Sequence, residues 1–376
     1  MNSGVQELGG RELAAKLAAI LAVPETLVRM PAAECDLLMR AARNAKLLGT
    51  LAHRLSEARV ESALPQVLRE QCASELALSR HRRQMVLWEI DRLSRALSDV
   101  DTPVVLLKGA AYIVQTLPAA AGRMPSDVDI LVRRDRIAEV ERTLLRKGWQ
   151  TTPMNAYDQR YYRQWSHEIP PLRYGPCPLE LDVHHAIVPP GGRARPAASE
   201  LIGSALTVPG SPFPVLSPED QTLHATLQLF YDSDCSNRLR DLLDIDGLLR
   251  TFSARPGYWE RLTQRAGAFG AAHSLACGLR HTARVFGTPI PDSVAAAVSA
   301  RGRGWLPQSA FDALVESAMA PAHPDGGAAR TAVAAAGLLR ARALCLRFPP
   351  SVVIRHVAAR TLHAVLKPVR PDTEVA

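Results

Sequence analysis

Two aspartates spaced two positions apart, Asp127 and Asp129, are the residues of this sequence best suited to chemistry. They lie in the stretch 127–132 (DVDILV), whose alternation predicts a β-strand with both carboxylates on one face. Two carboxylates at the end of a buried strand repel each other and are costly to desolvate, so they favour a bound cation. We therefore interpret Asp127 and Asp129 as ligands for Mg²⁺.

The Asp-x-Asp spacing by itself is a weak signal, because it occurs four times in the sequence. The other three pairs lie in a polar stretch, in a predicted loop and in a leucine-rich helical stretch, namely Asp99/Asp101, Asp232/Asp234 and Asp244/Asp246. Residues two apart on a helix do not face each other. Only the pair at 127 and 129 combines a strand with a Lys-Gly turn upstream. An ordinary strand end remains the alternative there.

The segment before these aspartates predicts a buried strand followed by a turn. Val104 to Leu107 is a four-residue apolar run, which fits a strand buried on both faces. Lys108 and Gly109 follow, and we expect the chain to turn at the glycine, where a backbone can approach a ligand closely. A short helix is predicted to begin after this turn.

A second strand supplies further groups that can bind a metal. The stretch 179–185 (LELDVHH) alternates strictly, so Glu180, Asp182 and His184 face one way and three aliphatic residues face the other. An edge strand with a solvated face is the alternative interpretation. If this strand lies beside 127–132, Asp182 becomes a third carboxylate, and the three can hold a nucleotide's phosphates through two Mg²⁺ ions.

These residues resemble the nucleotidyltransferase superfamily of DNA polymerase beta, and more closely a broad bacterial group of nucleotidyltransferase family proteins. The resemblance runs from about residue 33 to about residue 294. Five motifs carry it in order and spacing: Lys108-Gly109, Arg123, Asp127-Val128-Asp129, Gly148-Trp149 and Asp182-Val183-His184. Two positions depart from the usual pattern. Ala110 stands where a serine hydroxyl is common, and His185 stands where an aromatic residue commonly follows the histidine.

The resemblance implies an α+β fold with a small mixed β-sheet, flanked by an N-terminal helical bundle and a C-terminal all-helical region. It also implies Mg²⁺-dependent transfer of a nucleoside monophosphate from an NTP, with ATP the expected donor. Pyrophosphate leaves, and the acceptor is an unidentified hydroxyl on a protein, an RNA or a small molecule. The alternative is a catalytically degenerate scaffold or regulator of the same fold that only binds nucleotide. A helical protein that binds nucleic acid ranks last, because the sequence has no recognised reading motif.

The same resemblance assigns roles to individual residues. Asp127, Asp129 and Asp182 are the expected ligands of the two ions, and Asp182 also helps to deprotonate the acceptor. Phosphate-binding roles fall to the remaining motif residues: Lys108 and Arg123 offset charge on the pyrophosphate, and the amides of Gly109 and Ala110 cradle the phosphates at a helix N-terminus. His184 orients Asp182, contacts a phosphate, or is a structural residue bonded to backbone.

Composition places the chain among ordinary globular proteins. Its 376 residues are 47% hydrophobic and 22% charged, with a net charge of +8 that suits an anionic partner but is also common in arginine-rich proteins. The six cysteines show no C-x-x-C spacing, which favours reduced thiols. The start of the sequence has no signal-peptide pattern, and no apolar run approaches the ~18 residues that span a bilayer. We expect a cytoplasmic protein with no membrane partner.

The chain is expected to divide into five parts: a helical region at 1–100, an α/β nucleotidyltransferase core at 101–187, a Pro/Gly-rich loop or linker at 188–216, a helical domain at 217–368 and a disordered tail at 369–376. We favour a purely scaffolding role for the first part. Its basic segment 80–83 (RHRR) is interpreted as a solvated helix face in preference to a nucleic-acid contact. In the C-terminal helices, Asp244 could bind a base or acceptor, but a salt bridge to Arg240 is favoured.

Overall fold

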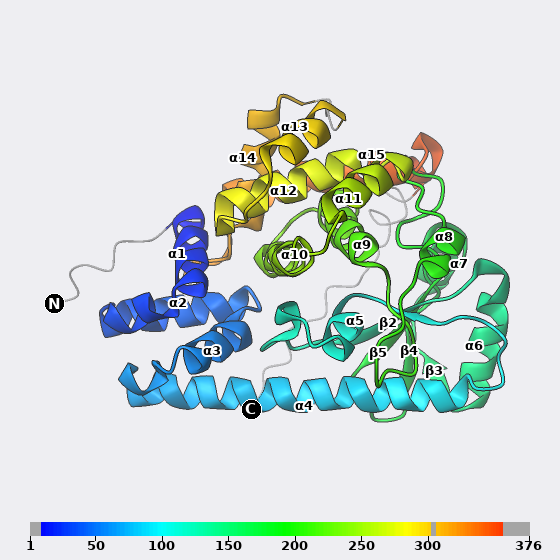
Figure 1. Cartoon of the computed structure of the whole chain (residues 1–376), viewed down its shortest axis with the longest axis horizontal. Coiled ribbons are helices and arrows are strands. Elements are labelled where there is room, and N and C mark those ends of the chain that lie inside the picture. The colour runs from blue at the N-terminus through cyan, green and yellow to red at the C-terminus, as the bar shows by residue number, and fades with distance from the viewer. Residues whose placement is uncertain (1–8, 302–305, 356–376) are drawn as a thin grey trace, which may run out of the picture.

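The computed structural model describes residues 9–301 and 306–355. Within them, helices surround one mixed sheet of five strands (Figure 1), which confirms the predicted α+β class. The strands are β1 (Val105–Leu106), β2 (Asp127–Leu131), β3 (Trp149–Thr151), β4 (Leu172–Tyr174) and β5 (Glu180–His184). Their order in the sheet is β1-β2-β5-β4-β3.

Strands β2 and β5 are neighbours in the sheet and run parallel, whereas the other adjacent pairs are antiparallel. Their register sets Asp129 beside Asp182 and Leu131 beside His184. Because side chains alternate along a strand, Asp127 lies on the same face as these residues. The two strands are therefore neighbours, as Asp182 requires in order to lie near Asp127 and Asp129.

The sequence over 167–174 and 178–185 predicts a hairpin that closes the sheet. The hairpin forms as β4 and β5, but it does not close the sheet. β5 is central, and β3 forms the edge beyond β4. Trp149 of β3 is buried and packs edge-to-face on Tyr174 of β4, with ring centroids 4.8 Å apart. This apolar contact favours the addition of β3 outside the hairpin.

The segment 188–216, expected to be a Pro/Gly-rich loop or linker, contains a helix, α8 (Ala198–Gly203). After α8, Val215 forms isolated bridges to Leu206 and to Leu106 of β1. The segment is therefore attached to the edge of the sheet, and it delivers the chain directly to the next helix.

The N-terminal helices are α1 (Gly10–Ala22), α2 (Ala32–Asn44), α3 (Leu48–Glu57) and α4 (Gln66–Ala96). The spacing of apolar residues predicts that helix continues over 33–55, but the helix is broken at Lys46, whose φ of 57° lies in the left-handed region. The charged and apolar faces of 68–97 predict one long helix, which is confirmed as α4. It runs from α3 to the sheet (Figure 1) and contacts α3, α5 (Lys108–Val114) and β2.

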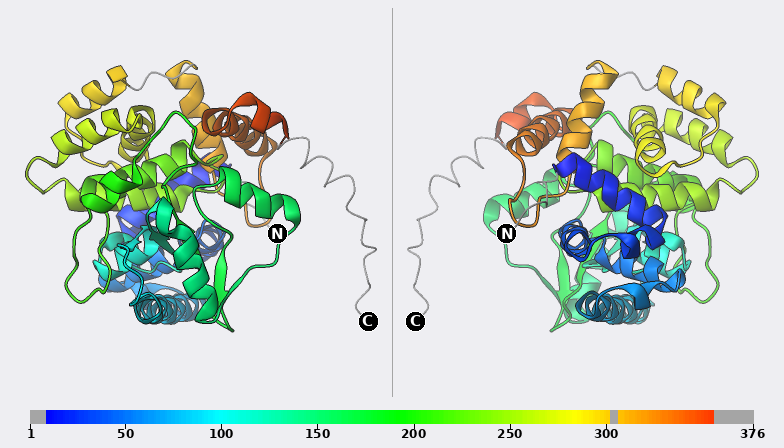
Figure 2. Two further views of the ribbon diagram at one scale, coloured as in Figure 1. Left: turned by 90° about the vertical axis from the view of Figure 1, so that its right-hand side faces the viewer. Right: turned by 90° about the vertical axis from the view of Figure 1, so that its left-hand side faces the viewer.

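The remaining helices flank the sheet and build the C-terminal part of the chain. They are α6 (Ile137–Arg146), α7 (Ala156–Trp165), α9 (Pro218–Phe230), α10 (Leu239–Phe252), α11 (Tyr258–Ala268), α12 (Ala272–Phe286), α13 (Asp292–Arg301), α14 (Gln308–Met319) and α15 (Arg330–Arg347). Helices α12 to α15 lie on the side of the molecule opposite to α4 (Figures 1 and 2). Across the ranges described, no helix combines the length and apolar character needed to cross a membrane. For the segment 352–366 the sequence favours a docked terminal helix over a helix on a membrane surface. Most of this segment, and the tail 369–376, lie outside the described residues.

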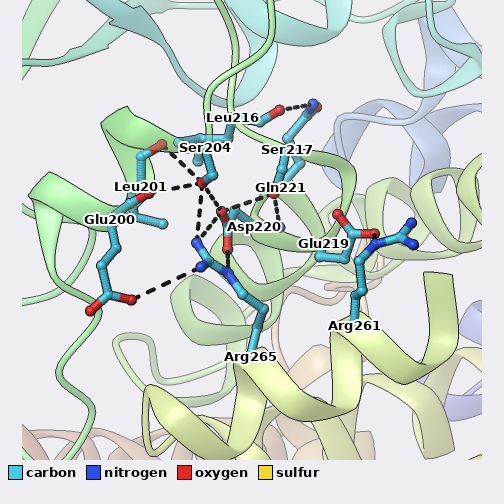
Figure 3. A network of polar contacts seen from close by, with 10 residues as sticks. All are labelled: Glu200, Leu201, Ser204, Leu216, Ser217, Glu219, Asp220, Gln221, Arg261 and Arg265. Atoms are coloured by element: carbon cyan, nitrogen blue, oxygen red, sulfur yellow. Dashed lines mark hydrogen bonds and ion pairs between the residues drawn. The ribbon is translucent and has the colours of Figure 1, made fainter. Parts of the chain in front are cut away.

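The start of α9 is fixed by a buried ion pair (Figure 3). Ser217 caps the helix by accepting a hydrogen bond from the backbone of Asp220, as its position before Pro218 predicts. The fully buried carboxylate of Asp220 accepts hydrogen bonds from Ser217, from Ser204 after α8 and from two nitrogens of Arg265, at 2.5–3.0 Å. Helices α8, α9 and α11 are thereby joined at one point.

Replacement of this carboxylate is expected to destabilise the fold. In Asp220→Ala, Arg265 loses its close counter-charge and retains only Glu200 at 3.9 Å, and the hydroxyl of Ser217 loses its acceptor, so the free energy of unfolding should fall by about 3 kcal/mol. Urea unfolding measures the change. Asp135→Ala, which removes an exposed ion pair with Arg133, is the matched control and should unfold like the unmodified chain. Equal stability of both variants would contradict the structural role of Asp220.

Candidate active site

Three polar side chains of β2 and β5 converge at one corner of the sheet. Asp129, Asp182 and His184 each offer a ligand atom, and these atoms lie within 4.8 Å of one another. Asp127, two residues before Asp129, lies on the same face and is partly exposed. The structure therefore brings together the acids that the sequence singled out.

Asp129 is almost completely buried, and its charge is satisfied by two neighbours. Lys108 Nζ lies 2.6 Å and His184 Nε2 lies 2.9 Å from the same carboxylate oxygen, Oδ1. Burial alone would raise the pKa of Asp129, but the charge of Lys108 and the hydrogen bond from His184 hold it below its usual range. Asp129 is therefore ionised, and its orientation is fixed.

The turn before α5 differs from the prediction in one respect. The left-handed residue is Lys108, with a φ of 45°, and not Gly109. Such a conformation is costly for a lysine, and here it accompanies the contact between Lys108 and Asp129. Gly109 serves another purpose: a Cβ there would lie 3.2 Å from Nε of Arg123, so glycine leaves room for that guanidinium. Both Gly109 and Ala110 are buried.

Asp182 has an oxygen without a partner. Its Oδ1 is buried and accepts no hydrogen bond from any described residue. Burial, followed by the negative charges of Asp129 and Glu168, raises the pKa of Asp182 to about 9. A cation beside this oxygen would offset both effects and favour the ionised carboxyl. Carboxylate oxygens are the ligands that hard divalent ions prefer, so this donor set fits Mg²⁺.

His184 has a role different from those proposed for it. The ring is completely buried and donates to Asp129, so it orients Asp129 and not Asp182, and it does not reach a phosphate in solvent. Its Nε2 also lies 3.3 Å from Glu168, a residue that the sequence analysis missed. Glu168 forms an antiparallel bridge with His184. The sequence predicts the hairpin that contains Glu168, but only the register of the two strands shows that Glu168 lies beside His184.

Arg123 is paired with an acid from a distant helix. Its guanidinium forms a short ion pair with Asp244 of α10, and both side chains are only 11% exposed. Burial would lower the pKa of Arg123, but the charge of Asp244 raises it. The favoured salt bridge between Asp244 and Arg240 is thus wrong, because Arg240 pairs with Asp241 at 3.0 Å. Asp244 pairs with an arginine 121 positions away in the sequence and not with its neighbour on the same helix.

A pocket of about 420 Å³ opens over the acids. Tyr112 lines it, together with four acids and six cations: Asp127, Asp129, Asp241, Asp244, Arg43, Lys46, Lys108, Arg123, Arg238 and Arg240. Arg43 and Lys46 come from the N-terminal region, for which the sequence favoured a purely scaffolding role. Gly109, Ala110 and Asp182 are not among the lining residues.

Helix α3 holds the loop that carries Arg123. Gly49 of α3 and Gly122 approach so closely that a Cβ on either would lie within 2.2 Å of the other's carbonyl oxygen. Beside them, the hydroxyl of Thr50 donates to the carbonyl of Ala121 at 3.1 Å. The position of Arg123 therefore depends on a backbone contact that only glycine permits.

Comparison with known proteins agrees with this geometry. A family model described as an uncharacterised nucleotidyltransferase matches residues 31–287, well over half of the chain. The chain belongs to this nucleotidyltransferase family. The resemblance seen in the sequence is thereby confirmed, and the general activity is transfer of a nucleotidyl group.

The other comparisons add little to this nucleotidyltransferase. No curated protein matches its sequence. Among solved structures, it is similar to an antigenic nucleotidyltransferase-like protein from Paracoccidioides brasiliensis, with 13% identity and a TM-score of 0.33. The match covers 56% of this chain and 96% of that one.

The pair between Arg123 and Asp244 gives a test of what holds the nucleotidyltransferase site together. In Asp244→Ala, Arg123 keeps a buried charge without a partner, so the free energy of unfolding should fall by about 3–5 kcal/mol. Replacing both partners, in Arg123→Met with Asp244→Leu, should recover most of this loss but not nucleotide binding. Urea unfolding and titration with a fluorescent ATP analogue measure the two effects.

The exposed pair between Asp91 and Arg95 supplies the control for this test. Asp91→Ala should leave both the unfolding curve and nucleotide binding unchanged. Full nucleotide affinity in the double variant would assign Arg123 to structure alone.

Proposed function

We propose that this nucleotidyltransferase transfers a nucleoside monophosphate, AMP from ATP as the expected donor, to a hydroxyl group of an acceptor and releases pyrophosphate. One observation carries the proposal: Asp129 and Asp182 are register partners on parallel strands, with Asp127 on the same face. Their convergence beneath a cationic pocket is the arrangement that phosphoryl chemistry needs. Family membership supports the general reaction.

The three carboxylates are the groups that would hold two Mg²⁺ ions. When bound, magnesium neutralises charge on the triphosphate and on the attacking oxygen. The chain itself keeps Asp129 in one orientation through Lys108 and His184, so the site is arranged before substrate arrives. Asp182, with one unpartnered oxygen, accepts the proton of the acceptor hydroxyl.

Side chains, and not backbone amides, bind the triphosphate in this proposal. Gly109 and Ala110 are buried beneath the pocket, whereas Lys46, Arg238 and Arg240 line it beside Lys108 and Arg123. Guanidinium groups match phosphate geometry through paired hydrogen bonds, and Lys46 is exposed. These cations offer an alternative to the serine hydroxyl that Ala110 lacks.

Asp129→Asn is the most direct test of turnover. The amide keeps the size of the side chain, whereas alanine would leave the buried ammonium of Lys108 without an acceptor. With Mg²⁺, each of the four NTPs and cell extract, pyrophosphate release should fall by about 10²–10³-fold or more, the loss typical of a charge-stabilising group. Folding is checked by urea unfolding of the same sample.

Two results would contradict the transferase proposal. An unchanged rate in Asp129→Asn would remove Asp129 from the chemistry. Tight NTP binding without any Mg²⁺-dependent NTP consumption by the unmodified chain would favour the nucleotide-binding scaffold, to which the replacement of the usual Gly-Ser by Gly109-Ala110 also points.

Metal binding gives a readout that does not depend on turnover. Titration with Mn²⁺, followed by calorimetry, should show binding that Asp182→Asn weakens by more than about 100-fold, since loss of even an outer partner of a ligand costs 10–100-fold. Glu180→Gln is the matched control, because Glu180 lies on the same strand and face but pairs with Arg173 at 2.9 Å. Equal Mn²⁺ affinity in the two variants would argue against Asp182 as a ligand.

A further inference from the structure

A second cavity, of about 750 Å³, adjoins the candidate active site. One face each of α3 and α4 and the segment 116–123 line it, and Gly122 and Arg123 line both spaces. Its cationic lining residues come from three parts of the chain: Arg54 from α3, Arg80 and Arg83 from α4, and Arg123 from the loop. Among the residues that line it, Glu57 is the one acid.

Three of these arginines have no carboxylate partner among the described residues. Arg54 donates to the carbonyl of Leu21, Arg80 to that of Leu76 at 3.2 Å, and Arg83 to that of Ile113 at 3.1 Å. Glu57 contacts His53 at 3.3 Å and forms no ion pair with these arginines, although its charge and that of Asp246 act on Arg54 from a distance.

Arginines that converge without counter-charges repel one another, and burial makes this more costly. Arg54 and Arg83 are half-buried, and burial lowers the pKa of Arg54. Arg123 also lines the cavity, but its guanidinium is paired with Asp244 and its Nε faces Gly109. The cavity therefore carries excess positive charge from Arg54, Arg80 and Arg83, which an anion would complement. Guanidinium groups favour phosphate and carboxylate because they donate two parallel hydrogen bonds.

We propose that this arginine cavity binds the acceptor of the nucleotidyl transfer, and that the acceptor is a small molecule carrying a phosphate monoester. The assignment of the acceptor to this cavity rests on the proposed function, whereas the assignment of an anion site rests only on the contacts of the arginines. The two negative charges of a phosphate monoester would offset much of the positive charge of Arg54, Arg80 and Arg83, which have no carboxylate partner among the described residues. The volume lies within the range of about 300–1,000 Å³ that small-molecule sites occupy.

Gly122 and Arg123 line both the arginine cavity and the first pocket, so an acceptor bound in the cavity lies next to the candidate active site. The cavity contains none of the three proposed metal ligands, so a phosphate bound there is held by arginines alone. Asp127 and Asp129 line the first pocket together with Gly122 and Arg123. In this proposal the acceptor's phosphate is anchored in the arginine cavity, and its hydroxyl enters the adjoining pocket that Asp127 and Asp129 line.

Binding of inorganic phosphate to the full chain tests the anion site. Equilibrium dialysis with labelled phosphate at low ionic strength should show binding that weakens as salt is added. Arg80→Gln combined with Arg83→Gln should reduce the affinity about tenfold or more, as expected for lost charge-assisted hydrogen bonds. Arg80→Gln alone, at an exposed position, should give part of this loss without the risk to folding.

Arg69→Gln is the matched control, because Arg69 is an exposed arginine of the same helix and does not line the cavity. Its phosphate affinity should equal that of the unmodified chain. Phosphate affinity that responds to Lys108→Met but not to the paired change at Arg80 and Arg83 would overturn the site.

The acceptor part is tested by the fate of the label from α-labelled ATP in cell extract. We expect the label in a dialysable product that binds to an anion exchanger and that phosphatase alters. The change at Arg80 and Arg83 should raise KM for the dialysable fraction while kcat is retained. Label on protein or RNA, or far tighter binding of a 5′-phosphorylated oligonucleotide through these arginines, would overturn a small-molecule acceptor.

The two proposals can fail separately. If phosphate binds as expected but the unmodified chain transfers no label to any fraction, the nucleotidyl transfer is refuted, the anion site stands and its acceptor role falls. If label is transferred but phosphate affinity is the same in every arginine variant, the transferase stands and the arginine cavity is refuted.

Discussion

A carboxylate buried in the corner of a sheet must be neutralised, and the arrangement of this chain follows from how Asp129 meets that requirement. Its two partners come from the turn after β1 and from β5, so all three strands must meet for the charge to be satisfied. The parallel pairing of β2 and β5 and the strained backbone of Lys108 serve the same contact. Fold and chemistry thus depend on one buried charge.

The ion pair between Arg123 and Asp244 extends this electrostatic network from the sheet to the C-terminal helices. Asp244 lies on α10, which contacts the short 3₁₀ helix Pro118–Ala120 before Arg123, and Gly247 of α10 approaches Ala119. On the other side, α3 contacts Gly122. Arg123 is therefore held between N-terminal and C-terminal helices, and both help to position the candidate active site.

Local patterns in the sequence were sufficient to predict the strands with their acids, the long helix α4 and the capped start of α9, because alternation, helical period and capping are properties of neighbouring residues. They did not reveal the partners made by folding. Asp244 prefers Arg123, 121 positions away, to its helical neighbour Arg240, and Glu168 reaches His184 only through strand register. The break at Lys46 also lacks a local signal such as glycine or proline.

The contact between Gly49 and Gly122 also fixes the axial position of α3. Backbone touches backbone there, at a spot where the next turn of the helix would present the side chain of His53. A shift of α3 by one turn is therefore sterically blocked. A larger residue at one of the two positions cannot be compensated by a smaller residue at the other, because both are already glycine. During divergence of such chains, these two positions would be constrained by geometry even where catalysis had been lost.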